Sequence, residues 1–418
     1  MNTIFDPNAA RDQVHQSIAL FNKYVKGMSS IGTLMISSAI QGGVCSFLGQ
    51  GEPGGGKTRA AEVIAVIIGG KTFLVQGTPD LQPKDIMGSE WLDMVDGKPT
   101  WKVSWSGMRN ANIVVGDEFN RMDTRTQATF MSPMSEGRCT MMAPHVPAEQ
   151  AVSMMHPVRV FLCVQNDVGS EGTNPLPPAQ YDRFLYMVNF DRIGREAEEE
   201  LLTDDSLGDR EVLERVAEER VLSLETILEV RKWIRANMYV HERFVKYQLS
   251  VIRATVPGTP EFKALWNKHP EIRPILDSVK SGVSVRGNMA LKRACQVRAF
   301  LFGKEKDDVT PRNFVMPEDL RALAHSVMDH RVVMNDRAAT RVVAPNATWD
   351  QWLKVFQRTN HSEDRSEFDF PTDGTITREE IVARLNRPGK NPILPSHMTD
   401  VVLAYTDFTA DPSDFSRR

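Results

Sequence analysis

The sequence predicts an α/β domain built on a parallel sheet, followed by an all-helical domain and a helical C-terminal extension. Three observations lead to this fold class. Short apolar strands alternate with helical patterns in the first half of the chain, the strand patterns stop after Phe190, and a glycine-rich octet, GEPGGGKT, lies between a strand and a helix. Strands that alternate with helices are typical of a parallel sheet covered by helices on both faces.

Five segments rich in Val, Ile, Leu and Phe are expected to form the sheet, namely residues 44–48, 72–75, 111–115, 158–164 and 184–190. They place the α/β domain at residues 1–190. Helical patterns such as DREVLERVAEER and SLETILEVRKWIRANM then predict a helical domain over residues 191–335.

Residues 336–418 form an extension whose role the sequence leaves open. Capping-box patterns at Thr348 to Gln351 and at Thr377 to Glu380 predict two short amphipathic helices. These helices are expected either to dock onto a partner or to pack on the second domain.

Charge and cysteine content narrow the classes of function. The 418 residues carry a formal net charge of -4, so no general basic field is expected to attract nucleic acid. The four cysteines are far apart and form no CxxC pair, which favours a reducing cytoplasm over a disulfide framework or a zinc site. No apolar run approaches the ~20 residues that cross a bilayer, and membrane insertion is not expected.

His325 and His330 form no metal-binding pair and are expected to be structural.

The octet matches the pattern G-x-x-x-x-G-K-[ST]. Its glycines let backbone N–H groups converge on phosphate oxygens at a helix N-terminus. We therefore expect a cradle for the phosphates of ATP, made of Gly51, Glu52, Pro53, Gly54, Gly55, Gly56, Lys57 and Thr58. Lys57 is expected to reach the β- and γ-phosphates, and the Thr58 hydroxyl to help hold Mg²⁺. A glycine-rich turn without a ligand is the alternative.

Two further strands end in polar residues where ligands bind in α/β proteins. NIVVGDEFNR ends in adjacent carboxylates, of which Asp117 is expected to hold Mg²⁺ and Glu118 to polarise an attacking water. RVFLCVQN ends at Asn166, whose neutral amide could orient water or sense the γ-phosphate. Alone, an apolar run followed by DE is a weak signal, and the cradle some sixty residues upstream strengthens it. For Asn166, an ordinary strand end is the alternative.

Several of these motifs, in order, resemble the MoxR group of AAA+ ATPases. The resemblance rests on GEPGGGKT, DEFNR, QNDVGSEGTNPLPPAQYDRF and VTPRNFVMPEDLRALAHSVMDHR, and it covers about residues 15 to 335. It implies an AAA+ nucleotide-binding domain followed by a helical lid domain. It also implies a homo-oligomeric, hexameric ring and a protein client, often with a von Willebrand type A protein.

The resemblance also implies two further site residues. Arg183, in PAQYDRF, corresponds to an arginine finger that enters the active site of the adjacent subunit. Arg286, in SGVSVRGNMALKRA, corresponds to the second sensor of the lid. Many family members have a proline before that sensor arginine, whereas this chain has Val285. An arginine that caps a strand and one exposed at a helix start are the respective alternatives.

A β-hairpin is expected near residues 90–105, because Asp96-Gly97 is a tight-turn pair flanked by alternating residues. Trp101, Val103 and Trp105 share one strand face. The resemblance places an insertion here that faces the pore or a substrate in related rings, whereas local packing is the alternative.

Three functions fit these residues. An ATP-hydrolysing ring that remodels, matures or activates a partner protein fits best. A nucleic-acid motor on the same fold is the second, with Lys102 and Arg109 beside the tryptophans as its contacts, although the acidic balance argues against it. A nucleotide-gated scaffold with little turnover is the third, and the intact Asp117-Glu118 pair argues against that.

Overall fold

The structure, a computed structural model of the chain, describes residues 5–43, 46–141, 143–166, 172–204, 207, 211–304, 310–335 and 395–406. The chain divides into two compact units, Met1–Trp233 and Ile234–Arg418. The two capping-box helices predicted near Thr348 and Thr377 lie outside the described residues.

Unit 1 begins with two helices and then alternates strands with helices. Its elements up to the third strand of the sheet are α1 (Pro7–Tyr24), α2 (Ser29–Gln41), β1 (Ser46–Gly51), α3 (Lys57–Ile68), β2 (Thr72–Gln76), α4 (Pro83–Met87), β3 (Gly88–Val95), β4 (Lys98–Trp105), η1 (Gly107–Asn110) and β5 (Ile113–Asp117). The rest are η2 (Phe119–Arg121), α5 (Thr124–Ala128), α6 (Met131–Glu136), β6 (Arg138–Thr140), β7 (Val152–Met154), β8 (Val160–Asn166), α7 (Pro178–Tyr181), β9 (Tyr186–Phe190), α8 (Arg195–Thr203), α9 (Val212–Glu219) and α10 (Leu224–Asn237), which runs across the division.

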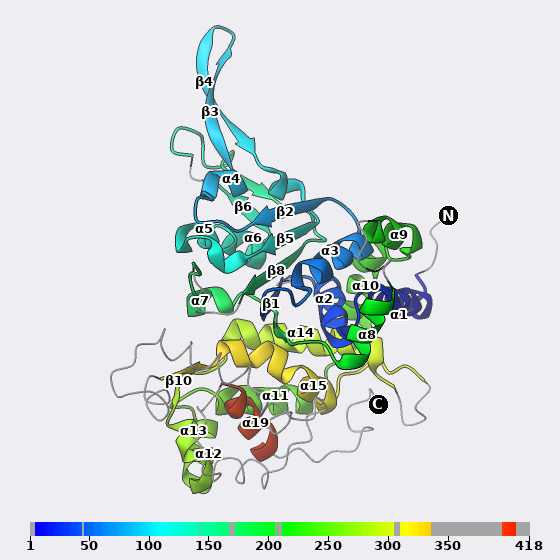
Figure 1. Cartoon of the computed structure of the whole chain (residues 1–418). Helices are drawn as coiled ribbons and strands as arrows, with labels where there is room; N and C mark the ends of the chain where they lie inside the picture. Colours follow the sequence, from blue (N-terminus) through cyan, green and yellow to red (C-terminus); the bar gives the residue numbers. More distant parts are fainter. Residues whose placement is uncertain are drawn as a thin grey trace. The chain divides into compact units, whose positions relative to one another are not determined.

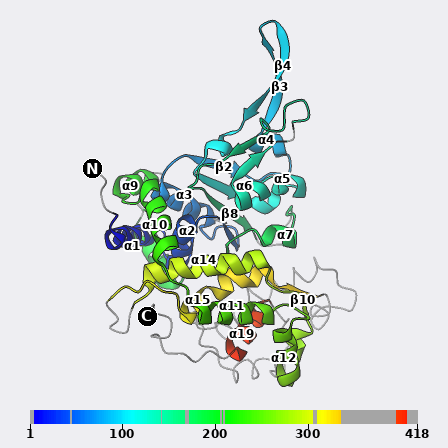
Figure 2. The same ribbon diagram turned by 180° about the vertical axis from the view of Figure 1, so that it is seen from behind.

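A five-stranded parallel sheet forms the centre of unit 1 (Figure 1). Figure 2 shows unit 1 from behind. The strands pair in the order β2-β5-β8-β1-β9. The three inner strands are buried along their whole length, which explains why they appear in the sequence as unbroken apolar runs. This confirms the predicted parallel sheet, and four of its five strands begin two residues later than predicted. All five strands run the same way, so their carboxyl ends lie along one edge.

Helices beyond the last strand also pack within unit 1. The α9 helix contacts α1 and α3. The Lys23 ammonium lies 2.7 Å from the Glu219 carboxylate, to which the Tyr24 hydroxyl donates a 2.6 Å hydrogen bond. The change to helical pattern near residue 191 and the division of the chain after Trp233 are therefore different features.

The β3 and β4 strands form an antiparallel hairpin that projects from unit 1 (Figures 1 and 2). Its turn is Asp96-Gly97, and both residues have positive φ, as a type I′ hairpin turn requires. Near the base, Val103 and Trp105 pack against a small cluster of Met141, Ala143, Val146 and Ala151. Part of the aromatic face is therefore used in local packing. Farther out, Leu92 and Met94 remain 51% and 64% exposed.

Unit 2 is mainly helical. Its elements are α11 (Glu242–Ala254), α12 (Pro260–Lys268), η4 (Pro270–Ile272), α13 (Arg273–Leu276), β10 (Val279–Ser281), α14 (Val285–Phe302), α15 (Pro317–Met328), η5 (Asp329–Arg331), β11 (Val333–Met334) and α19 (Pro395–Tyr405). The short β10 and β11 strands pair antiparallel. Among the described helices none is long and apolar enough to cross a membrane.

An ion cluster joins α19 to α15. The imidazole of His325 lies 3.1 Å from the Asp329 carboxylate on one side and 3.1 Å from the Asp400 carboxylate on the other. The Thr399 hydroxyl also donates a 2.6 Å hydrogen bond to Asp329. Burial alone would disfavour the imidazolium, but the attraction of Asp329 and Asp400 outweighs it and raises the pKa of His325 to about 11. His325 is therefore structural, as the sequence predicts.

The His325 cluster should make unit 2 less stable as the pH rises. Between pH 6.5, the ordinary pKa, and about pH 11, the folded protein keeps a proton that the unfolded chain has lost. Raising the pH through this window therefore lowers the free energy of unfolding. Solvent screening at a side chain 38% exposed should limit the loss to about 1 kcal/mol.

Denaturant unfolding of the protein and of His325→Gln at pH 6.5 and pH 9 would measure the loss. The stability difference between the two proteins should shrink at the higher pH, and Asp400→Asn should show part of the same effect. Parallel pH dependences of the parent and His325→Gln would contradict the assignment.

Candidate active site

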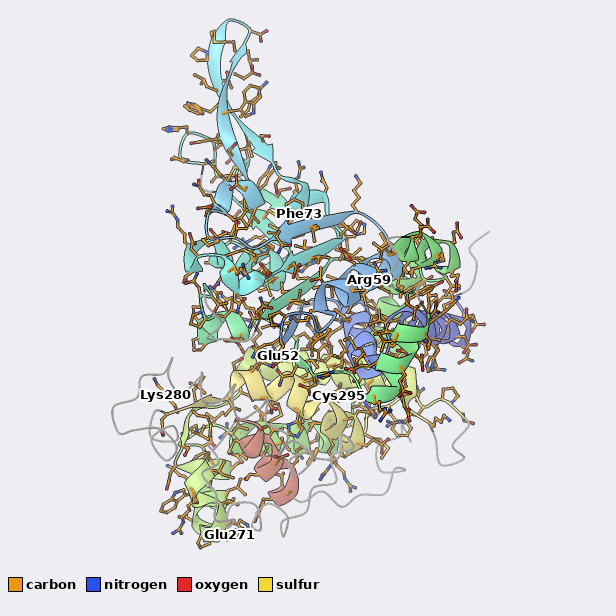
Figure 3. All side chains as sticks on the ribbon, in the orientation of Figure 1. Glu52, Arg59, Phe73, Glu271, Lys280 and Cys295 are labelled. Carbon is orange, nitrogen blue, oxygen red and sulfur yellow. The ribbon has the colours of Figure 1, made fainter. Side chains whose placement is uncertain are left out.

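The loop between β1 and α3 forms a backbone cradle at the carboxyl edge of the sheet. Gly54 and Gly56 have φ of +83° and +74°, a region that residues with a Cβ rarely adopt. Gly56 precedes the first residue of α3, and no side chain caps that helix. The first turn of a helix presents N–H groups without intrahelical partners, which suits an anionic ligand. Glu52, labelled in Figure 3, lies in the same loop.

Lys57 and Thr58, the first residues of α3, connect the cradle to its surroundings. The buried Lys57 ammonium donates to the carbonyls of Gly51 and Glu52 at 2.9 and 2.6 Å. The Thr58 hydroxyl donates a 3.0 Å hydrogen bond to Asp117 Oδ2 at the end of β5. Hence the sheet brings the octet and the first carboxylate of DEFNR together, as the sequence predicts.

The residues present fit a triphosphate with Mg²⁺. An added Cβ on Gly54 would meet nothing within 4 Å, so the space beside the loop is open. The Thr58 hydroxyl and the Asp117 carboxylate are hard oxygen donors, the kind that Mg²⁺ prefers, and they lie in direct contact. The cradle offers N–H groups and one ammonium to the phosphates.

Glu118 follows directly in an unusual backbone conformation. Its φ of +48° is one of two positive values among the described non-glycine residues. The conformation is held from two sides, because its N–H donates to Asp117 Oδ1 at 2.9 Å and its carbonyl lies against Gly77. Gly77 in turn donates its N–H to the Asp117 carbonyl at 2.8 Å. Strained backbone of this kind persists only where the surroundings enforce it.

Two further residues of DEFNR, which no motif assigns to the site, also shape it. Arg121 Nε lies 3.0 Å from Glu118 Oε2. Asn120 is fully buried and donates from Nδ2 to the carbonyl of Asn166 at 2.8 Å, which ties η2 to the end of β8. Their position two and three residues after Glu118 was the available signal. For Gly77 the available signal was its position directly after the end of β2.

Asn166 lies at the end of β8, in register with Gly51 of β1. It is 7% exposed. The sheet therefore places the first glycine of the cradle and the predicted polar strand end side by side, with Asp117 at the end of the next strand, β5.

Arg183 lies at the other end of the sheet. Its carbonyl accepts a 2.7 Å hydrogen bond from Ser46 at the start of β1, and its guanidinium donates to Ala179. Gly51 ends the same strand, about 17 Å away at ~3.3 Å per residue. This distance exceeds the reach of an arginine side chain, so Arg183 does not join the cradle of its own subunit.

Arg286 belongs to unit 2. It is the second residue of α14, whose N-cap Ser284 accepts a hydrogen bond from the N–H of Gly287. The Arg286 side chain is exposed. Its predicted role toward a nucleotide stays a prediction.

Comparisons with known proteins identify the family and the fold. Residues 47–186 match the family described as ATPases associated with various cellular activities, and residues 277–347 match an AAA lid domain. A solved structure of a suggested ATPase from Cytophaga hutchinsonii superposes with a TM-score of 0.63 at 24% identity, over 84% of this chain and 95% of the other. This structural likeness shows the fold, an α/β core with a helical lid.

Two relatives carry related names. Protein MoxR of Methylorubrum extorquens is 30% identical over 290 residues, which are 68% of this chain and 78% of the relative. Chaperone MoxR1 of Mycobacterium tuberculosis is 28% identical over 314 residues, or 73% of this chain and 72% of the relative. Both alignments cover more than two thirds of each protein.

Gly77→Ala should displace Glu118. The added Cβ would lie 2.2 Å from the Glu118 carbonyl oxygen, closer than real Cβ contacts allow. We expect the turnover number for ATP to fall about tenfold or more, because small misplacements of catalytic groups are costly. The KM for ATP should change less.

Gly194→Ala is a matched control, since an added Cβ there meets nothing within 4 Å. Steady-state ATPase assays on both variants, with thermal unfolding to exclude misfolding, would measure the effect. A folded Gly77→Ala protein with the parent turnover number would show that this contact does not position Glu118.

Proposed function

Because this chain belongs to the MoxR family of AAA+ ATPases, we propose that it forms a ring and uses ATP hydrolysis to remodel, mature or activate a partner protein. Its family makes it an ATP hydrolase. A chaperone role is supported by the name of its mycobacterial relative.

One observation carries the enzymatic part of the proposal. The hydroxyl of Thr58 is hydrogen-bonded to Asp117, and the next residue, Glu118, is held in a strained conformation beside them. Phosphate-binding loop and acidic strand end thus meet at one point of the sheet edge. A purely structural loop would require neither the contact nor the strain.

We assign each residue a part in hydrolysis. The N–H groups of the Gly51–Thr58 loop and the Lys57 ammonium bind the phosphates of ATP. Thr58 and Asp117 would hold Mg²⁺, which neutralises phosphate charge when bound. Glu118 accepts hydrogen bonds from a water molecule and orients it toward the γ-phosphate. Asn166, at the end of the neighbouring strand, hydrogen-bonds the same region with a neutral amide.

The last group of the proposed active site comes from a neighbouring subunit of the ring. Arg183 is too far from its own cradle, and we propose that it contacts ATP bound by the adjacent subunit of a closed, hexameric ring. Arg286 of the lid is proposed to contact the γ-phosphate from unit 2.

The partner is proposed to be a protein, in some cases with a von Willebrand type A domain. Nucleic acid is not the expected partner, given the net charge of -4. The exposed end of the hairpin, with Leu92 and Met94, is the part of unit 1 that we propose touches the client or the pore. The cytoplasmic location stays a prediction from the cysteine spacing.

Glu118→Gln should bind ATP and hydrolyse it at least ~10²-fold more slowly, because an amide cannot act as the base that polarises water. The ATP-bound variant should also retain its partner in a pull-down. Glu136→Gln, the same substitution at an exposed ion pair away from the cradle, is the control. Parent-like hydrolysis by Glu118→Gln, or failure to retain ATP, would refute the assignment.

Mixing two inactive variants tests whether Arg183 acts between subunits. Lys57→Ala subunits still offer Arg183, while Arg183→Ala subunits still offer an intact cradle. In a random 1:1 mixture roughly a quarter of the interfaces combine both intact groups, so up to that share of activity should return. The assay is ATP turnover before and after subunit exchange, and no recovery would count against action in trans.

A further inference from the structure

The ion pair between Arg121 and Glu118 has no part in the hydrolysis scheme above. Arg121 Nε lies 3.0 Å from Glu118 Oε2, and both residues belong to the same turn of chain. The side chains are 44% and 29% exposed. A cation that contacts the carboxylate proposed to orient water should either raise or lower the rate of ATP hydrolysis.

The backbone on both sides of this pair is fixed. Glu118 is held by Asp117 and by Gly77. Arg121 follows Asn120, which is anchored to the end of β8, and the Arg121 N–H donates to the Glu118 carbonyl at 2.8 Å. The Glu118 side chain is therefore the adjustable part, and Arg121 is the charged group that contacts it.

From this geometry we propose that Arg121 is a positioning residue that restrains Glu118 and lowers the rate of ATP hydrolysis. The inference rests on the proposed function of Glu118. An oxygen that accepts a hydrogen bond from a guanidinium has its charge partly neutralised, so it polarises water less well. The carboxylate must leave Arg121, or share it, before it can orient the attacking water.

The restraint is weak enough to be reversible. Half-exposed ion pairs are weak in water, and breaking one changes an equilibrium about two- to fivefold. Arg121→Gln, which removes the charge and keeps much of the length, should therefore raise the turnover number two- to fivefold. The KM for ATP should stay within about twofold, because Arg121 makes no contact with the cradle among the hydrogen bonds and ion pairs of the described residues.

The experiment compares steady-state ATPase rates of the full chain, Arg121→Gln, Glu118→Gln and the double variant. The double variant should be as slow as Glu118→Gln, because Arg121 acts only through that carboxylate. Arg138→Gln is the matched control, since Arg138 pairs with Glu136 at 2.7 Å and is 50% exposed. Its turnover number should equal that of the parent.

A second readout separates restraint from a structural role. Salt weakens the pair, so potassium chloride should raise the turnover number of the parent more than that of Arg121→Gln. Light scattering would show that both proteins assemble equally, and Arg121→Lys, with a smaller expected gain, replaces Arg121→Gln if that variant misfolds.

A turnover number for Arg121→Gln at or below that of the parent would overturn the inference. If Glu118→Gln is inactive in that case, the proposed function stands and the restraint alone fails. Parent-like activity of Glu118→Gln would instead remove the proposed function itself.

Discussion

The parallel pairing of β1 with β8, and of β8 with β5, is the constraint on which the site depends. It brings three carboxyl strand ends to one edge, where Gly51 lies beside Asn166 and Asp117 ends the next strand. The Thr58–Asp117 hydrogen bond then fixes the start of α3 to that edge. Without this register the loop, the acidic pair and the amide would be separate features of the chain. The hydrogen bond from Ser46, at the start of β1, to the Arg183 carbonyl places Arg183 at the opposite end of the sheet, which makes a second subunit part of the chemistry we propose.

Around Glu118 the fold accepts local strain to obtain a defined position. A left-handed backbone at a non-glycine residue costs roughly 1–3 kcal/mol, and it is held by Asp117, by the close approach of Gly77 and by the anchored turn at Asn120. Because the backbone of Glu118 is fixed, only its side chain is free to move. A single partner such as Arg121 can then influence reactivity without any change in the fold.

The sheet and most of the cradle could be predicted from the sequence, because buried parallel strands and phosphate loops have local signatures. The Asp117 contact followed from the position of the acid at a strand end. Gly77 and Arg121 could not be found in the same way, since their importance arises from a close approach between β2 and β5 and from a side-chain orientation. The packing of α9 on α1 and α3 could not be predicted for a similar reason, because a helical pattern does not show which elements the helix packs against. The roles of Arg183 and Arg286 remain predictions from the resemblance.

The α19 helix has a consequence for where the chain can be shortened. The matched lid segment ends at residue 347, yet Met398, Val401 and Val402 are fully buried within unit 2, where α19 contacts α11, α13 and α15. At about 1.5–3 kcal/mol for each such side chain, this burial is comparable with the whole stability of an ordinary domain. A protein truncated at residue 347 would lose α19 and expose the apolar surface of unit 2 that this helix covers. A truncation after Tyr405, where α19 ends, would keep that surface buried.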